Sequence, residues 1–180
     1  VVQLPILDRV GRVVALRHLD PSLQTRDPET PVLLMAGGYG KRLYPLTEKT
    51  PKPMLAVGEK PILQTILENF VNEGFRKFYF SVHYLSSQIE EHFGDGSKWG
   101  AEIEYLVETE PLGTAGALGL MPATTPDGPL ILMNSDLLTE VSFRRLLDYH
   151  KEQGGPATVC VREYDLELPY GVVKPVENFV

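Results

Sequence analysis

The fold of this 180-residue chain is decided by the stretch Leu34-Met35-Ala36-Gly37-Gly38-Tyr39-Gly40-Lys41-Arg42-Leu43-Tyr44-Pro45-Leu46-Thr47. It begins inside an apolar run, Val32 to Ala36, which we predict to be the first strand. Three glycines within four positions allow backbone N–H groups to approach a ligand without obstruction by Cβ atoms. The pattern indicates a strand followed by a loop that cradles phosphate or ribose.

Two familiar glycine-rich patterns do not match this loop. A dinucleotide-binding fingerprint requires a third glycine at the position of Leu43. A Walker loop requires Ser or Thr in place of Arg42 and an earlier glycine in place of Met35. What remains is a glycine-rich loop that carries two cations, Lys41 and Arg42.

A third cation, Lys52, follows in the segment Pro51-Lys52-Pro53-Met54-Leu55. The two prolines restrict φ and favour extended neighbours, so the ammonium group is presented from a stiff segment. Stiffness suits the positioning of a phosphate. The alternative is that Lys41, Arg42 and Lys52 are solvated surface cations beside an ordinary turn, and the Pro-Lys-Pro segment at this spacing disfavours it.

The rest of the chain alternates short apolar runs with segments of helical periodicity, which predicts βαβ units. We therefore expect an α/β fold with a doubly wound, mostly parallel sheet. The predicted strands are Val32–Ala36, Phe78–Val82, Ile103–Val107, Pro129–Met133 and Ala157–Val161. The predicted helices are Lys60–Gly74, Ser86–Phe93, Thr114–Met121 and Ser142–Gln153.

The N-terminal part has a different pattern. Apolar runs at Gln3–Leu7 and Arg12–Leu16 surround Asp8-Arg9-Val10-Gly11, which predicts a small β-hairpin. A stretch rich in Pro, Ser, Thr, Asp and Glu follows, as is typical of a linker. The expected division is a hairpin at residues 1–19, a linker at 20–30 and the main domain at 31–180.

Composition limits the classes of function. The formal net charge of −7 disfavours a general nucleic-acid surface, which needs an excess of Lys and Arg. No stretch reaches the roughly 18 apolar residues of a membrane span, so we expect no membrane partner. The single cysteine, Cys160, excludes an internal disulfide and indicates a cytoplasmic protein, and we expect it buried in the last strand. The oligomeric state, including a homo-oligomer, stays open.

Several motifs together resemble the signature of sugar-1-phosphate nucleotidyltransferases, and mannose-1-phosphate guanylyltransferases most. They are Gly-Gly-x-Gly-x-Arg-Leu-x-Pro-Leu-Thr from Gly37, Pro51-Lys52-Pro53-Met54-Leu55, Gly58-x-Lys60-Pro61-Ile62-Leu63, Glu108-Thr109-Glu110-Pro111-Leu112-Gly113-Thr114-Ala115-Gly116-Ala117-Leu118, Asn134-Ser135-Asp136 and Tyr170-Gly171-Val172-Val173. The resemblance runs from about Pro31 to the end of the chain. It implies transfer of a nucleoside monophosphate from an NTP to a sugar 1-phosphate, with Mg²⁺ as cofactor and pyrophosphate as product.

The resemblance also implies roles for individual residues. Arg42 would hold the β- and γ-phosphates, Lys52 would contact the α-phosphate and the sugar phosphate, and Asp136 would ligate Mg²⁺. The nucleotide would be bound by Ala36, Gly37, Gly38, Gly40, Lys41, Glu108 and Gly113, and the sugar by Gly171. In the family a second Mg²⁺-binding Asp and a Glu-Lys-Pro sugar motif lie further along the chain than Val180.

The residues independently support part of this scheme. Asp136 follows an apolar strand, at the edge where open α/β sheets bind ligands, and a carboxylate suits Mg²⁺. Its alternative role is a cap for the following helix. A sugar phosphate has a second pKa of about 6, so its attacking oxygen is largely ionised at neutral pH and needs no general base. The four histidines, which share no metal-ligand spacing, are expected to be structural or surface residues: His18, His83, His92 and His150.

Base choice and rival functions stay open. In the family the position of Glu108 faces the nucleobase, and a carboxylate accepts from N–H groups, which favours GTP. Uridylyl-transferring relatives also carry Glu there, so uridylyl, thymidylyl or cytidylyl transfer is the alternative. The N-terminal hairpin resembles the closing strands of a CBS domain, a module that binds adenine nucleotides, and this makes a non-catalytic nucleotide sensor a second alternative. A dehydrogenase is disfavoured by Leu43.

Overall fold

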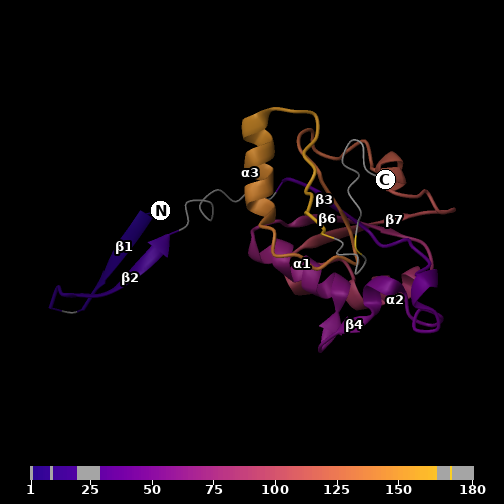
Figure 1. Ribbon diagram of the computed structural model, residues 1–180, viewed down its shortest axis with the longest axis horizontal. Helices are drawn as coiled ribbons and strands as arrows, with labels where there is room; N and C mark the ends of the chain where they lie inside the picture. Colours follow the sequence, from indigo (N-terminus) through magenta and orange to yellow (C-terminus); the bar gives the residue numbers. More distant parts are fainter. Residues whose placement is uncertain (1, 9, 20–28, 166–170, 172–180) are drawn as a thin grey trace.

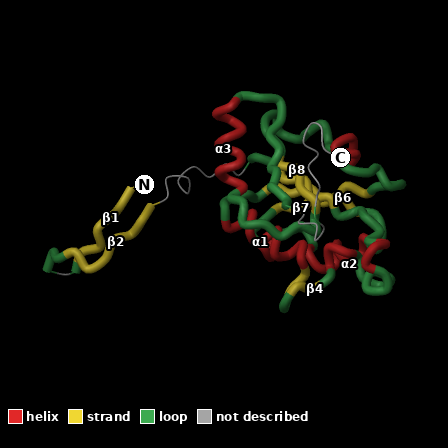
Figure 2. The backbone as a smooth tube through the Cα atoms, viewed as in Figure 1, coloured by secondary structure: helices red, strands yellow, loops and turns green. Residues whose placement is uncertain are grey.

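The computed structural model describes residues 2–8, 10–19, 29–165 and 171 (Figures 1 and 2). Near the N-terminus, β1 (Val2–Leu7) and β2 (Val13–Leu19) pair in antiparallel fashion and form the predicted hairpin. Asp8 stabilises its turn, because the side-chain oxygen accepts from the backbone N–H groups of Val10 and Arg12 at 2.9 Å each. The predicted linker falls largely on residues 20–28, which lie outside the described part of the chain.

A four-stranded parallel sheet forms the centre of the main domain. Its strands are β3 (Val32–Met35), β6 (Lys77–Val82), β7 (Glu102–Val107) and β8 (Ile131–Asn134), in the order β7-β6-β3-β8. Val32, Leu33 and Leu34 of β3 have no exposed surface. β3 is a central strand that is covered on both faces, and this explains why its sequence is apolar throughout and does not alternate with polar residues.

Three helices and a crossover segment cover the two faces of the sheet. The helices α1 (Ile62–Asn72), α2 (Ser86–Phe93) and α3 (Phe143–Gln153) share one hydrophobic cluster with Val32 and Leu34. Within it the rings of Phe70 and Phe143 stack with centroids 3.6 Å apart. Leu33, on the opposite face, packs with Tyr79, Leu106 and Ala117, the last from the 3₁₀ helix η5 (Gly116–Leu120).

The strand order creates a switch point at β3. From β3 the chain moves through α1 to β6 and then to β7, and it returns across the sheet to place β8 on the other side of β3. Ligands of doubly wound, Rossmann-like sheets bind in the crevice at such a point.

Two expectations about this domain were wrong. Residues Ala157–Val161 form no strand, although their composition is typical of one. Among the residues that the structure describes, β8 is the edge of the sheet and no strand pairs with residues 157–161, so Val159 and Val161 are 76% and 88% exposed. Cys160 is likewise an exposed free thiol and not a buried one. β-propensity reflects packing against neighbouring strands, and this segment lacks them.

Smaller differences concern element type and bounds. The helix predicted at Thr114–Met121 is the 3₁₀ helix η5, and α1 begins at Ile62 because Lys60 and Pro61 form the short strand β5. β5 pairs with β4 (Ala56–Val57) in a small hairpin that was not predicted. In the described parts of the chain, no helix is long and apolar enough to span a membrane.

Glu73 at the end of α1 also caps α3. Its Oε2 atom accepts from the backbone N–H of Arg144 at 2.7 Å and from the Ser142 hydroxyl at 3.0 Å. Ser142, the N-cap of α3, accepts in turn from the backbone N–H of Arg145 at 3.3 Å. A carboxylate is favourable at a helix N-terminus, where backbone N–H groups lack partners.

We therefore expect Glu73→Ala to lower the free energy of unfolding by about 1–2 kcal/mol, the usual loss when a helix cap is removed. Urea denaturation followed by circular dichroism measures this change. Glu91→Ala is the matched control, because Glu91 is an exposed helical glutamate on α2, and it should change stability little. Equal stabilities of the two variants would contradict the capping role of Glu73.

Candidate nucleotide-binding site

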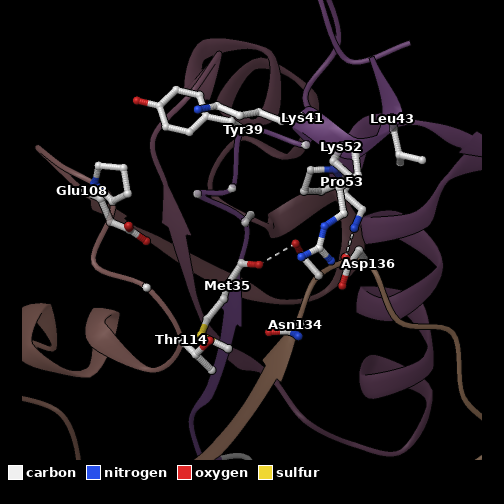
Figure 3. Close-up of a pocket in the computed structure, with 18 residues that line it drawn as sticks. Met35, Tyr39, Lys41, Leu43, Lys52, Pro53, Glu108, Thr114, Asn134 and Asp136 are labelled. Carbon is white, nitrogen blue, oxygen red and sulfur yellow. Dashed lines mark hydrogen bonds and ion pairs between the residues drawn. The ribbon is translucent and has the colours of Figure 1, made fainter. Parts of the chain in front are cut away.

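A cavity of about 630 Å³ opens at the carboxyl ends of β3 and β8, at the switch point of the sheet. Figure 3 shows the residues that line it. They include every residue that the sequence predicted for catalysis or nucleotide binding: Ala36, Gly37, Gly38, Gly40, Lys41, Arg42, Lys52, Glu108, Gly113 and Asp136. Residues separated by up to 100 positions in the sequence thus meet in one place, and their individual roles stay predictions.

The glycine loop is held in a defined conformation. Ala36 N–H donates to the carbonyl of Ser81 at 2.7 Å, which extends the pairing of β3 with β6 into the loop. Gly40 has φ +63°, and a Cβ atom there would lie 2.8 Å from Cγ2 of Thr47. The Thr47 hydroxyl donates to the Gly40 carbonyl at 3.0 Å. Glycine is therefore required at position 40 for two reasons. The loop adopts the left-handed conformation there, and Thr47 occupies the space that a Cβ atom would need.

The cations of the loop lie on the short 3₁₀ helix η2 (Lys41–Leu43). Lys41 and Arg42 are both exposed and line the cavity. Nζ of Lys41 lies 5.3 Å from the ring centroid of Tyr39, a cation–π contact that restrains the side chain. Two cations of the loop therefore line the cavity, although the chain as a whole is acidic.

Lys52 and Asp136 form an ion pair across the cavity, between Nζ and Oδ2 (Figure 3). Lys52 begins the 3₁₀ helix η3 (Lys52–Met54), and both flanking prolines, Pro51 and Pro53, are buried. Asp136 follows β8. The two side chains are 34% and 30% exposed, so the pair is accessible to a ligand. The stiff segment predicted from the prolines does present the ammonium group to the cavity.

Glu108 is a buried carboxylate, only 7% exposed, at the opposite wall of the cavity. Its Oε1 accepts a hydrogen bond from the Ser81 hydroxyl, and its Oε2 accepts from the backbone N–H of Leu112 at 3.2 Å. A Cβ atom on Gly37 would lie 2.7 Å from Oε1. Gly37 therefore permits the carboxylate to approach the backbone of the glycine loop.

His83 forms a bridge between the two walls that was not predicted from the sequence. Nδ1 of His83 lies 2.8 Å from the carbonyl oxygen of Glu108, and Nε2 lies 2.9 Å from the Tyr39 hydroxyl. A carbonyl only accepts, so Nδ1 carries a proton, and in the neutral imidazole Nε2 accepts from the Tyr39 hydroxyl. This bridge agrees with the structural or surface role predicted for His83, whose partners were not predicted. Its place just beyond the carboxyl end of β6, next to the strand that enters the glycine loop, was the signal that could have identified it.

Of the two remaining predicted glycines, one lines the cavity and the other does not. Gly113 lines the cavity with φ +74°, in the segment that follows Glu108. Gly171 is exposed and is not among the residues that line the cavity, and its neighbours at 166–170 and 172–180 lie outside the described residues. Asn134 and Thr114 line the cavity without having been assigned a role. Within the described ranges, no group of three or more His, Cys, Asp or Glu side chains forms a ready metal site.

Comparison with known proteins identifies relatives by sequence and by structure. The chain is 38% identical over 152 residues to the mannose-1-phosphate guanylyltransferase catalytic subunit beta of Drosophila melanogaster, which covers 83% of this chain and 41% of that protein. It is 37% identical over 144 residues to the mannose-1-phosphate guanyltransferase of Saccharomyces cerevisiae, covering 78% and 40%. The crystal structure of HddC from Yersinia pseudotuberculosis, complexed with GMP-PN, superposes with a TM-score of 0.60 at 26% identity, over 67% and 54% of the two chains.

The chain therefore spans about two fifths of the length of the two guanylyltransferase relatives. A family model described as Nucleotidyl transferase matches residues 31–179, which includes every residue that lines the cavity. The resemblance first read from the glycine loop is thus confirmed at the level of the family. Since the match extends over most of the sequence, this protein belongs to the nucleotidyl transferase family.

Proposed function

We propose that the chain carries the nucleotide site of an enzyme that transfers GMP from GTP to a sugar 1-phosphate, most simply mannose 1-phosphate, and releases pyrophosphate. The observation that carries the proposal is the meeting of the glycine loop, Arg42, Lys52 and Asp136 in one cavity at the switch point of the sheet. The names of the relatives, mannose-1-phosphate guanylyltransferases, support the choice of substrates.

The glycine loop and η2 suit the β- and γ-phosphates. The glycine loop, Lys41 and Arg42 all line the same cavity. An anion of several charges is bound best where fixed donors and cations surround it, because no rearrangement is needed when the charge arrives. Arg42 would hold the departing pyrophosphate, since its guanidinium matches the geometry of phosphate oxygens.

Lys52 and Asp136 suit the reacting phosphate. Their ion pair keeps a cation and an anion at one point of the cavity, where a phosphate would attract Lys52 and a divalent cation would attract Asp136. The residues present fit Mg²⁺, which is commonly held by one or two carboxylates together with substrate phosphates. Mg²⁺ bound there would supply positive charge against the phosphate oxygens. Lys52 would screen the repulsion between the sugar phosphate and the triphosphate and align the two for in-line attack.

No side chain has to remove a proton in this reaction. The attacking oxygen belongs to a phosphate whose second pKa is about 6, so it is already ionised at neutral pH. The bond from this oxygen to the α-phosphorus forms as the bond to the β-phosphate oxygen breaks, and pyrophosphate leaves. The barrier is the approach of two anions, and the cations of the cavity lower it.

Further parts of the proposal concern the N-terminal hairpin, Cys160 and Gly171. The N-terminal hairpin, which resembles part of a CBS domain, would belong to a regulatory module at residues 1–19 joined through residues 20–30 to the catalytic domain at 31–180. The exposed thiol of Cys160 supports a reducing, cytoplasmic location. Gly171 would contact the sugar, as the family pattern implies.

Lys52→Ala should lower kcat by on the order of 10²- to 10³-fold, the loss seen when one donor to a transition state is removed. The measurement is pyrophosphate release by the full-length protein with GTP, mannose 1-phosphate and Mg²⁺. Lys60→Ala provides a matched control, because Lys60 is also ion-paired, with Glu68 on α1, and does not line the cavity. Turnover by Lys52→Ala close to that of the control would remove Lys52 from the mechanism.

A thermal-shift panel tests the substrate assignment. GTP with Mg²⁺ should raise the melting temperature more than ATP, CTP or UTP at the same concentration, because the nucleotide with the lowest Kd stabilises the folded state most. A ligand present at 100 times its Kd stabilises it by about 2.7 kcal/mol. Sugar 1-phosphates are then added with the best nucleotide. Binding of GTP without pyrophosphate release from the full-length protein would favour a nucleotide sensor, and a stronger shift with UTP would favour uridylyl transfer.

A further inference from the structure

The carboxyl end of β6 holds Glu108 at two points. The Ser81 hydroxyl donates to the Glu108 carboxylate, and the imidazole of His83 donates to the Glu108 carbonyl. Ser81 has no exposed surface, so water does not compete for its hydroxyl. The family resemblance assigns no role to either residue. Both the side chain and the backbone of Glu108 are thus fixed by the strand next to β3.

Strand geometry explains why Ser81 can reach Glu108. Ser81 pairs in register with Met35, and Met35 with Asn134, so the three side chains share one face at the carboxyl end of the sheet. This is the face on which Leu33 and Tyr79 pack against η5. The segment that leaves β7 with Glu108 crosses the same face. Ser81 is consequently placed beneath Glu108 by the pleat of β6.

The hydrogen bonds of Glu108 determine what it can offer a ligand. One oxygen accepts from Ser81 and the other from the backbone N–H of Leu112. An ionised carboxylate has about four acceptor positions, so one remains on each oxygen. Glu108 lines the cavity, and its carboxylate points toward the glycine loop (Figure 3). The side chain is therefore presented as a fixed pair of acceptors.

We propose that Ser81 is a positioning residue that sets the preference for guanine by holding the Glu108 carboxylate as a double acceptor at the base subsite. Guanine presents two adjacent donors, N1–H and the 2-amino group, which match a carboxylate. Adenine and cytosine place an acceptor beside their single amino group, and uracil has one N–H between two acceptors. The proposal rests on the proposed function, which brings a nucleoside triphosphate into this cavity.

The test compares GTP with ITP, which lacks the 2-amino group. In the unmodified full-length protein kcat/KM should favour GTP by about 10- to 100-fold, the worth of one hydrogen bond to a charged group. Ser81→Ala should raise the KM for GTP by about 10-fold, leave kcat nearly unchanged and bring the GTP-to-ITP ratio toward one. Loss of structural support alone would affect both nucleotides equally.

A double-mutant cycle shows whether Ser81 acts through Glu108. Glu108→Gln replaces one acceptor by a donor and should itself reduce the GTP-to-ITP ratio. If Ser81 works by orienting this carboxylate, Ser81→Ala should have little further effect on the ratio in the Glu108→Gln background. Additive effects of the two substitutions would overturn the proposal.

Ser142→Ala is the matched control. It removes a hydrogen bond of the same kind, from a serine to a glutamate, at the start of α3, and Ser142 does not line the cavity. It should lower the melting temperature and leave the GTP-to-ITP ratio as it is. A Ser81→Ala variant with the same behaviour as this control would reduce Ser81 to a structural residue and overturn the proposal.

Gly37→Ala provides a second route if Ser81→Ala does not fold. Its Cβ would displace Oε1 of Glu108, whereas a Cβ on Gly119 of η5, which does not line the cavity, has no atom within 4 Å. Gly37→Ala should therefore reduce the GTP-to-ITP ratio, and Gly119→Ala should preserve it. Equal ratios would contradict the role of the Glu108 position.

Failure of the proposed function would look different. In that case the unmodified protein would release no pyrophosphate with any nucleotide and sugar 1-phosphate. The thermal shifts with GTP and ITP would then still test Ser81, since they report binding and not turnover. Equal shifts with the two nucleotides in the unmodified protein would overturn the inference about guanine.

Discussion

The parallel pairing of β3 with β6 on one side and β8 on the other is the constraint on which the site depends. Because the strands are parallel, the segments that follow them all emerge at one edge of the sheet. This edge therefore brings together groups that are far apart in the sequence: the glycine loop, Ser81, His83 and Asp136. The buried apolar residues of β3 and the helices on the first face hold this arrangement in place. A ligand cavity follows directly from the strand order.

Charged side chains of both signs line the cavity, within a chain that is acidic as a whole. Lys41, Arg42 and Lys52 line one part of the cavity, and Glu108 lies at the opposite wall. The cations suit phosphates, while the buried carboxylate suits the N–H groups of a base. The Tyr39–His83 bridge ties the two walls together through hydrogen bonds of 2.9 and 2.8 Å. The spacing between the glycine loop and the wall that carries Glu108 is consequently held by hydrogen bonds of the protein itself, which is what preorganisation of a binding site requires.

Much of the fold and of the site could be predicted from local sequence. The helices α1, α2 and α3 and the four strands follow from hydrophobic periodicity, because each buries one face or both. The conformation of the glycine loop follows from Gly40, and that of the Pro-Lys-Pro segment follows from its two prolines. The strand expected at residues 157–161 was wrong, since strand formation depends on a neighbouring strand and not on composition alone. The partners of His83 could not be predicted, because Tyr39 and Glu108 come from other segments of the chain.

The sequence by itself determined the local conformations and the chemical kinds of group available. A left-handed glycine, a lysine between prolines and an aspartate after an apolar strand are properties of short segments, and local sterics and hydrophobicity are sufficient to define them. Only the tertiary structure decided which groups meet. The pairing of Lys52 with Asp136 and of Ser81 with Glu108 joins residues 84 and 27 positions apart. Such partners are chosen by strand order and by the pleat of the sheet, which depend on how the whole domain buries its apolar surface.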